Sequence, residues 1–163
     1  MEDNTTKALA NTLKYCTSFV ALKFLEWLEI TATGNVEVEL QKPNISTEKI
    51  YRTSHRLLLG LVDKAEENVD SIRAKLEEAE PVSGDSRPDA WLYGENFVVL
   101  IESKVGNASL QLNQMRCHFQ KLQKSADKQP YFQVHTWAEI HQFFVKLSSE
   151  LKDKNKWLVE QFI

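Results

Sequence analysis

The sequence predicts a mixed α/β domain, and two kinds of pattern carry this prediction. Several segments place an apolar residue at every third or fourth position, which is the spacing of a helix that buries one face. Between them lie strand-like runs: residues 35–41 alternate apolar and polar side chains, and residues 97–101 are all apolar and rich in β-branched types. With 163 residues, of which 42% are hydrophobic, the chain should form a single domain, residues 1–163, with its own core.

The first half of the chain predicts a helix, a strand and a second, longer helix. Residues 5–30 have helical spacing, with an expected break near Thr17, and residues 35–41 follow as a half-exposed strand. Residues 46–80 repeat apolar side chains every three or four positions, and Gly60 is expected to kink or divide them. We interpret 46–80 as a long helical insertion after the first strand. It could cover the sheet, form a dimer seam or contact substrate, and packing is the favoured alternative.

A β-hairpin is predicted next, from residues 88–93 and 96–105, with its turn at Gly94. The apolar run of the second strand indicates a strand covered on both faces. Side chains alternate along a strand, so Glu102 and Lys104 should project from the same side. Charged groups at the end of a buried strand need partners, water or a metal ion, because burying an unpaired ion costs several kcal/mol.

Asp89, near the start of the first hairpin strand, should lie close to these two charges. If the strands pair through the turn, their far ends meet, and Asp89 approaches Glu102 and Lys104. Two carboxylates in a small space repel each other, and a hard divalent cation relieves that repulsion. The alternative is an exposed ion pair at a strand end, which would contribute little.

The remaining chain predicts a helix, a strand and two helices. An amphipathic helix carries Gln114, and residues 131–135 have the composition of a strand. Thr136 and Glu139 have the spacing of a capping box, so a helix should begin there. C-terminal helices follow, the last over residues 155–163.

The hairpin residues resemble the PD-(D/E)XK nuclease superfamily, the fold of many restriction endonucleases. Pro88 and Asp89 match the first half of its motif, and Glu102, Ser103 and Lys104 match the second. The resemblance implies a restriction-endonuclease-like αβββαβ core with a mixed central sheet. In that interpretation the predicted helical insertion and the C-terminal helices are additions to the core.

The resemblance also implies a metal site. Mg²⁺, or Mn²⁺ in its place, would be bound by Asp89, Glu102 and the backbone carbonyl of Ser103, while Lys104 would orient or help to deprotonate the attacking water. Family members often add an acidic residue from the first helix, and Glu2 is the matching position here.

The helix after the hairpin contains a segment similar to the Gln-x-x-x-(Tyr/His) segment of many family members. Gln114 would then complete the catalytic set by positioning substrate or water, and His118 and Arg116 would contact substrate. The alternatives are a solvent-facing amide for Gln114 and a partly buried, hydrogen-bonded histidine for His118.

The function expected from this resemblance is Mg²⁺-dependent hydrolysis of nucleic acid, with DNA favoured and RNA left open. A formal net charge of −3 excludes a strongly basic nucleic-acid binder, although basic residues outnumber acidic ones after residue 100. The alternatives are a catalytically inactive protein of the same fold that binds nucleic acid or protein, and a helical assembly protein. No signal peptide or membrane span is expected, so a cytoplasmic location is predicted, and homodimerisation is left open.

Overall fold

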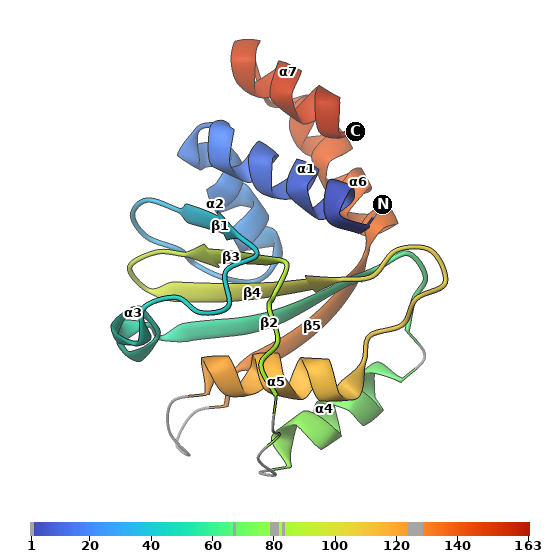
Figure 1. Ribbon diagram of the computed structural model, residues 1–163. Helices are drawn as coiled ribbons and strands as arrows, with labels where there is room; N and C mark the ends of the chain where they lie inside the picture. Colours follow the sequence, from blue (N-terminus) through green and yellow to red (C-terminus); the bar gives the residue numbers. More distant parts are fainter. Residues whose placement is uncertain (1, 67, 79–81, 83, 124–128) are drawn as a thin grey trace.

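The α/β prediction is confirmed by the computed structural model, which describes residues 2–66, 68–78, 82, 84–123 and 129–163 (Figure 1). In chain order the described elements are α1 (Glu2–Tyr15), α2 (Ser18–Trp27), β1 (Glu37–Leu40), α3 (Thr47–Arg52), β2 (His55–Val62), α4 (Val69–Glu77), β3 (Ala90–Tyr93), β4 (Phe97–Ser103), α5 (Leu112–Leu122), β5 (Tyr131–Thr136), α6 (Trp137–Ser148) and α7 (Asp153–Phe162).

The five strands form one open, mixed sheet in the order β1-β3-β4-β2-β5. The pairs β1–β3 and β3–β4 are antiparallel, as the predicted hairpin requires, whereas β2 is parallel to both β4 and β5. The carboxyl ends of β4, β2 and β5 therefore meet at one end of the sheet. The loops that follow β4 and β2 lie side by side there, on the right in Figure 1.

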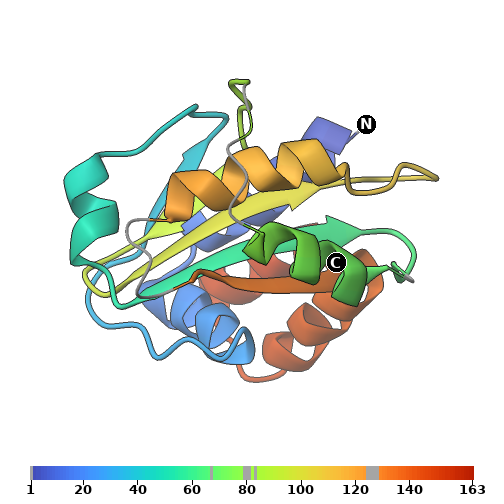
Figure 2. The same cartoon turned by 90° about the horizontal axis from the view of Figure 1, so that it is seen from below.

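Helices cover both faces of the sheet, so the molecule has three layers. Helices α1, α2, α6 and α7 lie on one face, and α4 and α5 lie on the other (Figures 1 and 2). Along β4 the side chains alternate between the two cores: Val99 and Ile101 pack towards α1 and α2, while Val98 and Leu100 pack towards α5. This two-sided burial explains why residues 97–101 are apolar without interruption. No helix in the described part of the chain is long and apolar enough to cross a membrane.

The predicted helical insertion over residues 46–80 is wrong. The segment contains α3, β2 and α4, and β2 lies inside the sheet between β4 and β5. Seven of the eight residues of β2 are buried, and a strand buried on both faces has no polar alternation that would distinguish it from a buried helix. Gly60 does not kink a helix. A Cβ atom there would lie 2.7 Å from Cδ1 of Leu110, so glycine allows the loop after β4 to pack closely on β2.

The other predicted elements are present, with shifts of a few residues at their ends. The break near Thr17 is confirmed, because α1 ends at Tyr15 and α2 begins at Ser18. The capping box is also confirmed: the Glu139 N–H donates to Oγ1 of Thr136, and the Glu139 carboxylate accepts the N–H of Thr136. It fixes the point where β5 turns into α6.

Candidate active site at the end of the hairpin

Asp89 lies immediately before β3, beside the end of β4. Its backbone N–H donates to the carbonyl of Ile101 at 3.0 Å, which continues the hairpin ladder. Its carboxylate oxygen Oδ2 accepts two hydrogen bonds from Ser103, one from the backbone N–H at 2.8 Å and one from the hydroxyl at 3.0 Å. The role of the Ser103 carbonyl as a metal ligand, which the resemblance implies, stays a prediction. The N–H and hydroxyl of Ser103 hold the Asp89 side chain in place.

Glu102 is the most deeply buried acidic group of the site, with 2% of its surface exposed. Its Oε1 lies 2.9 Å from Nζ of Lys104, and its Oε2 lies 2.8 Å from Nε2 of His118. Lys104 itself is largely covered, with 15% of its side chain exposed. A carboxylate at this depth requires such partners, because an unpaired buried ion is costly. The structure thus brings Glu102 and Lys104 together on the side predicted from strand alternation.

The two carboxylates also interact electrostatically. The pKa of Asp89 is raised above its ordinary value, first because the group is buried and next because the Glu102 charge is near. The hydrogen bonds from Ser103 and the charge of Lys104 oppose this rise without cancelling it. Asp89, Glu102 and Lys104 therefore form one cluster, and its negative charge is not fully balanced.

His118 has no exposed surface. Besides Glu102 it contacts Ser86, whose Oγ lies 2.9 Å from Nδ1 of the imidazole. Direct contact between His118 and substrate, which the resemblance implies, does not fit this burial. The alternative from the sequence, a hydrogen-bonded histidine, describes its position, although the burial is complete and not partial. The signal available in the sequence was the helical position of His118. Its partner Glu102 became evident only from the packing of α5 on β4.

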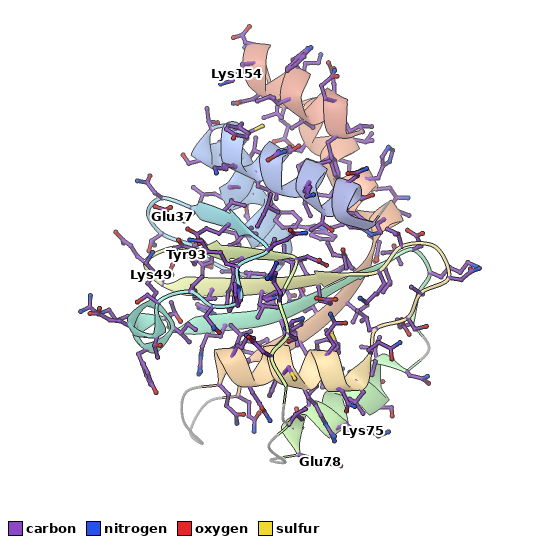
Figure 3. All side chains as sticks on the ribbon, in the orientation of Figure 1. Glu37, Lys49, Lys75, Glu78, Tyr93 and Lys154 are labelled. Atoms are coloured by element: carbon purple, nitrogen blue, oxygen red, sulfur yellow. The ribbon has the colours of Figure 1, made fainter. Side chains whose placement is uncertain are left out.

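Of the two other residues expected on α5, one shares the face of His118 and one does not. Gln114 is half-buried and lies one helical turn before His118, on the same face. Arg116 instead points to the end of α4, where its Nε lies 3.4 Å from the carbonyl of Lys75 and its Nη2 lies 3.6 Å from Glu78 (Lys75 and Glu78 are labelled in Figure 3). Among the described residues, the hydrogen bond and ion pair of Arg116 connect it to the end of α4 and not to the hairpin cluster.

The first helix reaches the cluster through Thr6. Its hydroxyl contacts that of Ser103 at 2.5 Å, and Ser103 donates its own proton to Asp89, so Thr6 is the donor in this contact. The side chain of Glu2, one turn earlier on α1, lies outside the part of the chain that the structure describes.

Hydrogen bonds between two loops border the site, and the sequence did not predict them. The loop after β4 is bound to the loop after β2 at three points. The N–H of Gly106 donates to the carboxylate of Asp63, Lys64 donates to Oδ1 of Asn107 at 3.1 Å, and the N–H of Leu110 donates to Glu66 at 3.0 Å. Gly106 has φ +70°, a left-handed conformation that glycine adopts without strain. These contacts fix the backbone that follows Lys104.

The carboxylates of Asp89 and Glu102 are the side chains of the site that could serve as ligands for a divalent cation. Within the described residues, no group of three or more His, Cys, Asp or Glu side chains is placed to hold a metal ion. Mg²⁺ needs few protein ligands, since it is commonly bound through one or two carboxylates, with water and substrate phosphate filling the other positions. The repulsion felt by Asp89 near Glu102 is the kind of imbalance that a cation relieves.

Comparison with known proteins provides no independent assignment. No family model, no curated protein and no solved structure matches this chain. The geometry of the hairpin cluster is therefore the basis on which a function can be proposed.

Proposed function

We propose that this protein is a metal-dependent nuclease of the PD-(D/E)XK type, which hydrolyses phosphodiester bonds of DNA with a metal-activated water. The observation that carries this proposal is the convergence of Asp89, Glu102 and Lys104 at the end of the β3–β4 hairpin. Two carboxylates that interact with each other, with a lysine 2.9 Å from one of them, are the groups that this chemistry needs.

Each residue of the cluster has a distinct role in the proposed reaction. Asp89 and Glu102 would hold Mg²⁺ or Mn²⁺, which supplies a bound water of lowered pKa and offsets the charge that develops on the phosphate. Lys104 would orient that water or stabilise the negative transition state, since its ammonium is a compact positive charge close to the metal ligands. Gln114, on the α5 face that carries His118, would contribute to positioning.

The order of the elements supports the finer fold assignment. When residues 46–80 are left out, the chain runs from α1 and α2 through β1, β3 and β4 to α5 and β5, which is the αβββαβ order of the nuclease core. We infer that β2 is an additional strand inserted between β4 and β5 of that core.

A cleavage assay with matched lysine variants tests the proposal. Purified protein is incubated with labelled DNA and RNA in single-stranded, duplex and branched forms, with Mg²⁺, with Mn²⁺ or with a chelator. Wild type and the variant Lys146→Ala, which alters an exposed lysine of α6, should cleave only with the metal. Lys104→Ala should not cleave, although circular dichroism shows that it is folded. Metal-dependent cleavage by Lys104→Ala at the wild-type rate would remove the assignment.

One observation favours a second candidate, a catalytically inactive protein of this fold that binds nucleic acid or protein. Both oxygens of Glu102 already have partners, Lys104 and His118, so the cluster can be satisfied without a metal. Calorimetric titration with Mg²⁺ or Mn²⁺ separates the two candidates. The nuclease requires binding that is lost in Asp89→Asn and Glu102→Gln, whereas the inactive module requires none.

A further inference from the structure

The unassigned part of the site is the buried hydrogen-bond chain behind Glu102. It runs from Ser86 Oγ to His118 Nδ1 over 2.9 Å, and from His118 Nε2 to Glu102 Oε2 over 2.8 Å. These two hydrogen bonds connect three separate parts of the fold: the segment before β3, helix α5 and strand β4. Neither strand alternation nor the proposed metal chemistry by itself requires a histidine at this position.

We propose that His118 is a positioning residue, which holds the Glu102 carboxylate in the orientation that binds the metal ion, and that Ser86 in turn orients the imidazole of His118. This inference rests on the proposed nuclease function, because it assigns Glu102 as a metal ligand.

The direction of each hydrogen bond follows from the chemistry of the groups. An ionised carboxylate can only accept, so Nε2 of His118 must carry the proton that it shares with Glu102. In a neutral imidazole the other nitrogen is then an acceptor, and the hydroxyl of Ser86 is its donor. Ser86 therefore favours the one tautomer that can donate to Glu102.

The burial of the pair explains why this support is needed. Lys104 donates to Oε1 of Glu102 from the end of the strand, whereas Oε2 lies beside a group inside the protein. His118 supplies that second contact, and its full burial denies water access to the position. With both oxygens fixed, the remaining lone pairs of the carboxylate point in defined directions, which is what a metal ligand requires.

The same geometry argues against a different use of these residues, as a Ser-His-acid triad with Ser86 as nucleophile. The imidazole of such a triad must accept the serine proton and then deliver it to a leaving group. His118 has no exposed surface from which it could reach a leaving group. The hydrogen bonds from Ser86 to His118 and from His118 to Glu102 are therefore suited to supporting the Glu102 carboxylate and not to transferring a proton to substrate.

Metal affinity, measured by calorimetric titration of Mn²⁺ into the full chain without nucleic acid, tests the proposal. His118→Leu removes the donor to Glu102 and should weaken binding about 10- to 100-fold, the usual effect of losing a group that supports a metal ligand. His118→Gln, whose amide N–H can occupy the position of Nε2, should bind close to wild type. Ser86→Ala, a change in a partly exposed loop, should fold normally and show a smaller loss than His118→Leu.

Leu122→Ala is the matched control. Leu122 is fully buried on the same helix, one turn beyond His118, and it makes neither of the two hydrogen bonds to Glu102, so its truncation loosens α5 while both of those bonds remain. It should lower thermal stability and keep the wild-type affinity for Mn²⁺.

The outcomes separate the two levels of the argument. If wild type binds Mn²⁺ and His118→Leu binds it equally well, the positioning role is wrong and the nuclease proposal stands. The positioning role is also contradicted if His118→Gln is as weak as His118→Leu, or if Leu122→Ala is. If wild type binds no Mn²⁺ at all, the metal site fails, and the positioning role fails with it.

Discussion

At the scale of single residues, the end of β4 uses both faces of the sheet. Glu102 and Lys104 face α5, whereas the hydroxyl of Ser103 meets Thr6 of α1. The N–H and hydroxyl of Ser103 also reach the carboxylate of Asp89. Alternation along one strand thus gives each of the two carboxylates its own support.

A substitution of Ser103 tests whether its hydroxyl contacts with Asp89 and Thr6 stabilise the fold. Ser103→Ala removes a hydrogen bond to Asp89 and the acceptor of Thr6 in a place with no exposed surface, so the free energy of unfolding should fall by about 1–3 kcal/mol. Urea unfolding in chelator measures this loss. Ser149→Ala, which removes an exposed hydroxyl after α6, is the control and should change stability little. Equal stability of the two variants would contradict the assigned contacts.

The sequence predicted the part of the site that depends on covalent geometry. Glu102 and Lys104 share a face because they are two residues apart on a strand. Asp89 is near them because, in a hairpin, the start of the first strand pairs with the end of the second. The contact of His118 with Glu102 depends instead on how α5 packs against the sheet, which no local pattern specifies. Arg116 illustrates the same limit, since its helix was predicted but its direction towards α4 was not.

At the scale of elements, the error over residues 46–80 has a physical cause. Leu57, Leu58, Leu61 and Val62 have helical spacing by coincidence, because in a strand buried on both faces nearly every residue is apolar. Such a run can be recognised only by its short length and its neighbours. In contrast, residues 35–41 were predicted as a strand because one face of an edge strand stays polar.

The junction of β5 and α6 predicts a pH dependence of stability. Burial lowers the pKa of His135 below its ordinary value of 6.5, although the charge of Glu139 partly opposes this. Its ring lies 4.5 Å from that of Trp27, and its Nδ1 has no hydrogen-bond partner among the described residues. The folded protein therefore disfavours the charged form of this side chain.

The sign of the effect follows from proton binding. As the pH falls below about 6.5, the unfolded chain takes up a proton at His135 before the folded chain does, so acidification favours unfolding. Wild type should lose stability between pH 7 and pH values below the lowered pKa, and His135→Gln should lose less over the same range. Thermal unfolding across a pH series in one buffer system measures both. Parallel curves for the two proteins would show that His135 does not contribute.

At the scale of the whole molecule, one end of the sheet brings together two kinds of group. The parallel strands β4, β2 and β5 end there, and the open end of the antiparallel β3–β4 hairpin lies there too. The cluster lies there, bordered by the tethered loops after β4 and β2, while the hairpin turn lies at the opposite end. Open α/β sheets commonly bind ligands beyond the carboxyl ends of their parallel strands. For the proposed nuclease, the substrate is thus expected to approach this end of the sheet.

For the proposed nuclease, the net charge of −3 predicts that binding of nucleic acid depends on the metal ion. Without metal, the carboxylates of the cluster repel phosphate, and the chain has no excess of basic residues to compensate. In the Lys104→Ala background, which the proposed function predicts to be cleavage-deficient, DNA affinity measured by fluorescence anisotropy should be weak in chelator and should rise with Mn²⁺.

Adding Asp89→Asn to this background should strengthen binding in chelator, because one repelling charge is lost, and should reduce the gain with Mn²⁺. Adding Glu37→Gln instead removes an exposed charge beside Tyr93, at the turn end of the hairpin, and should alter neither value much (Figure 3). An equal effect of both substitutions would mean that overall charge, and not the cluster, governs binding.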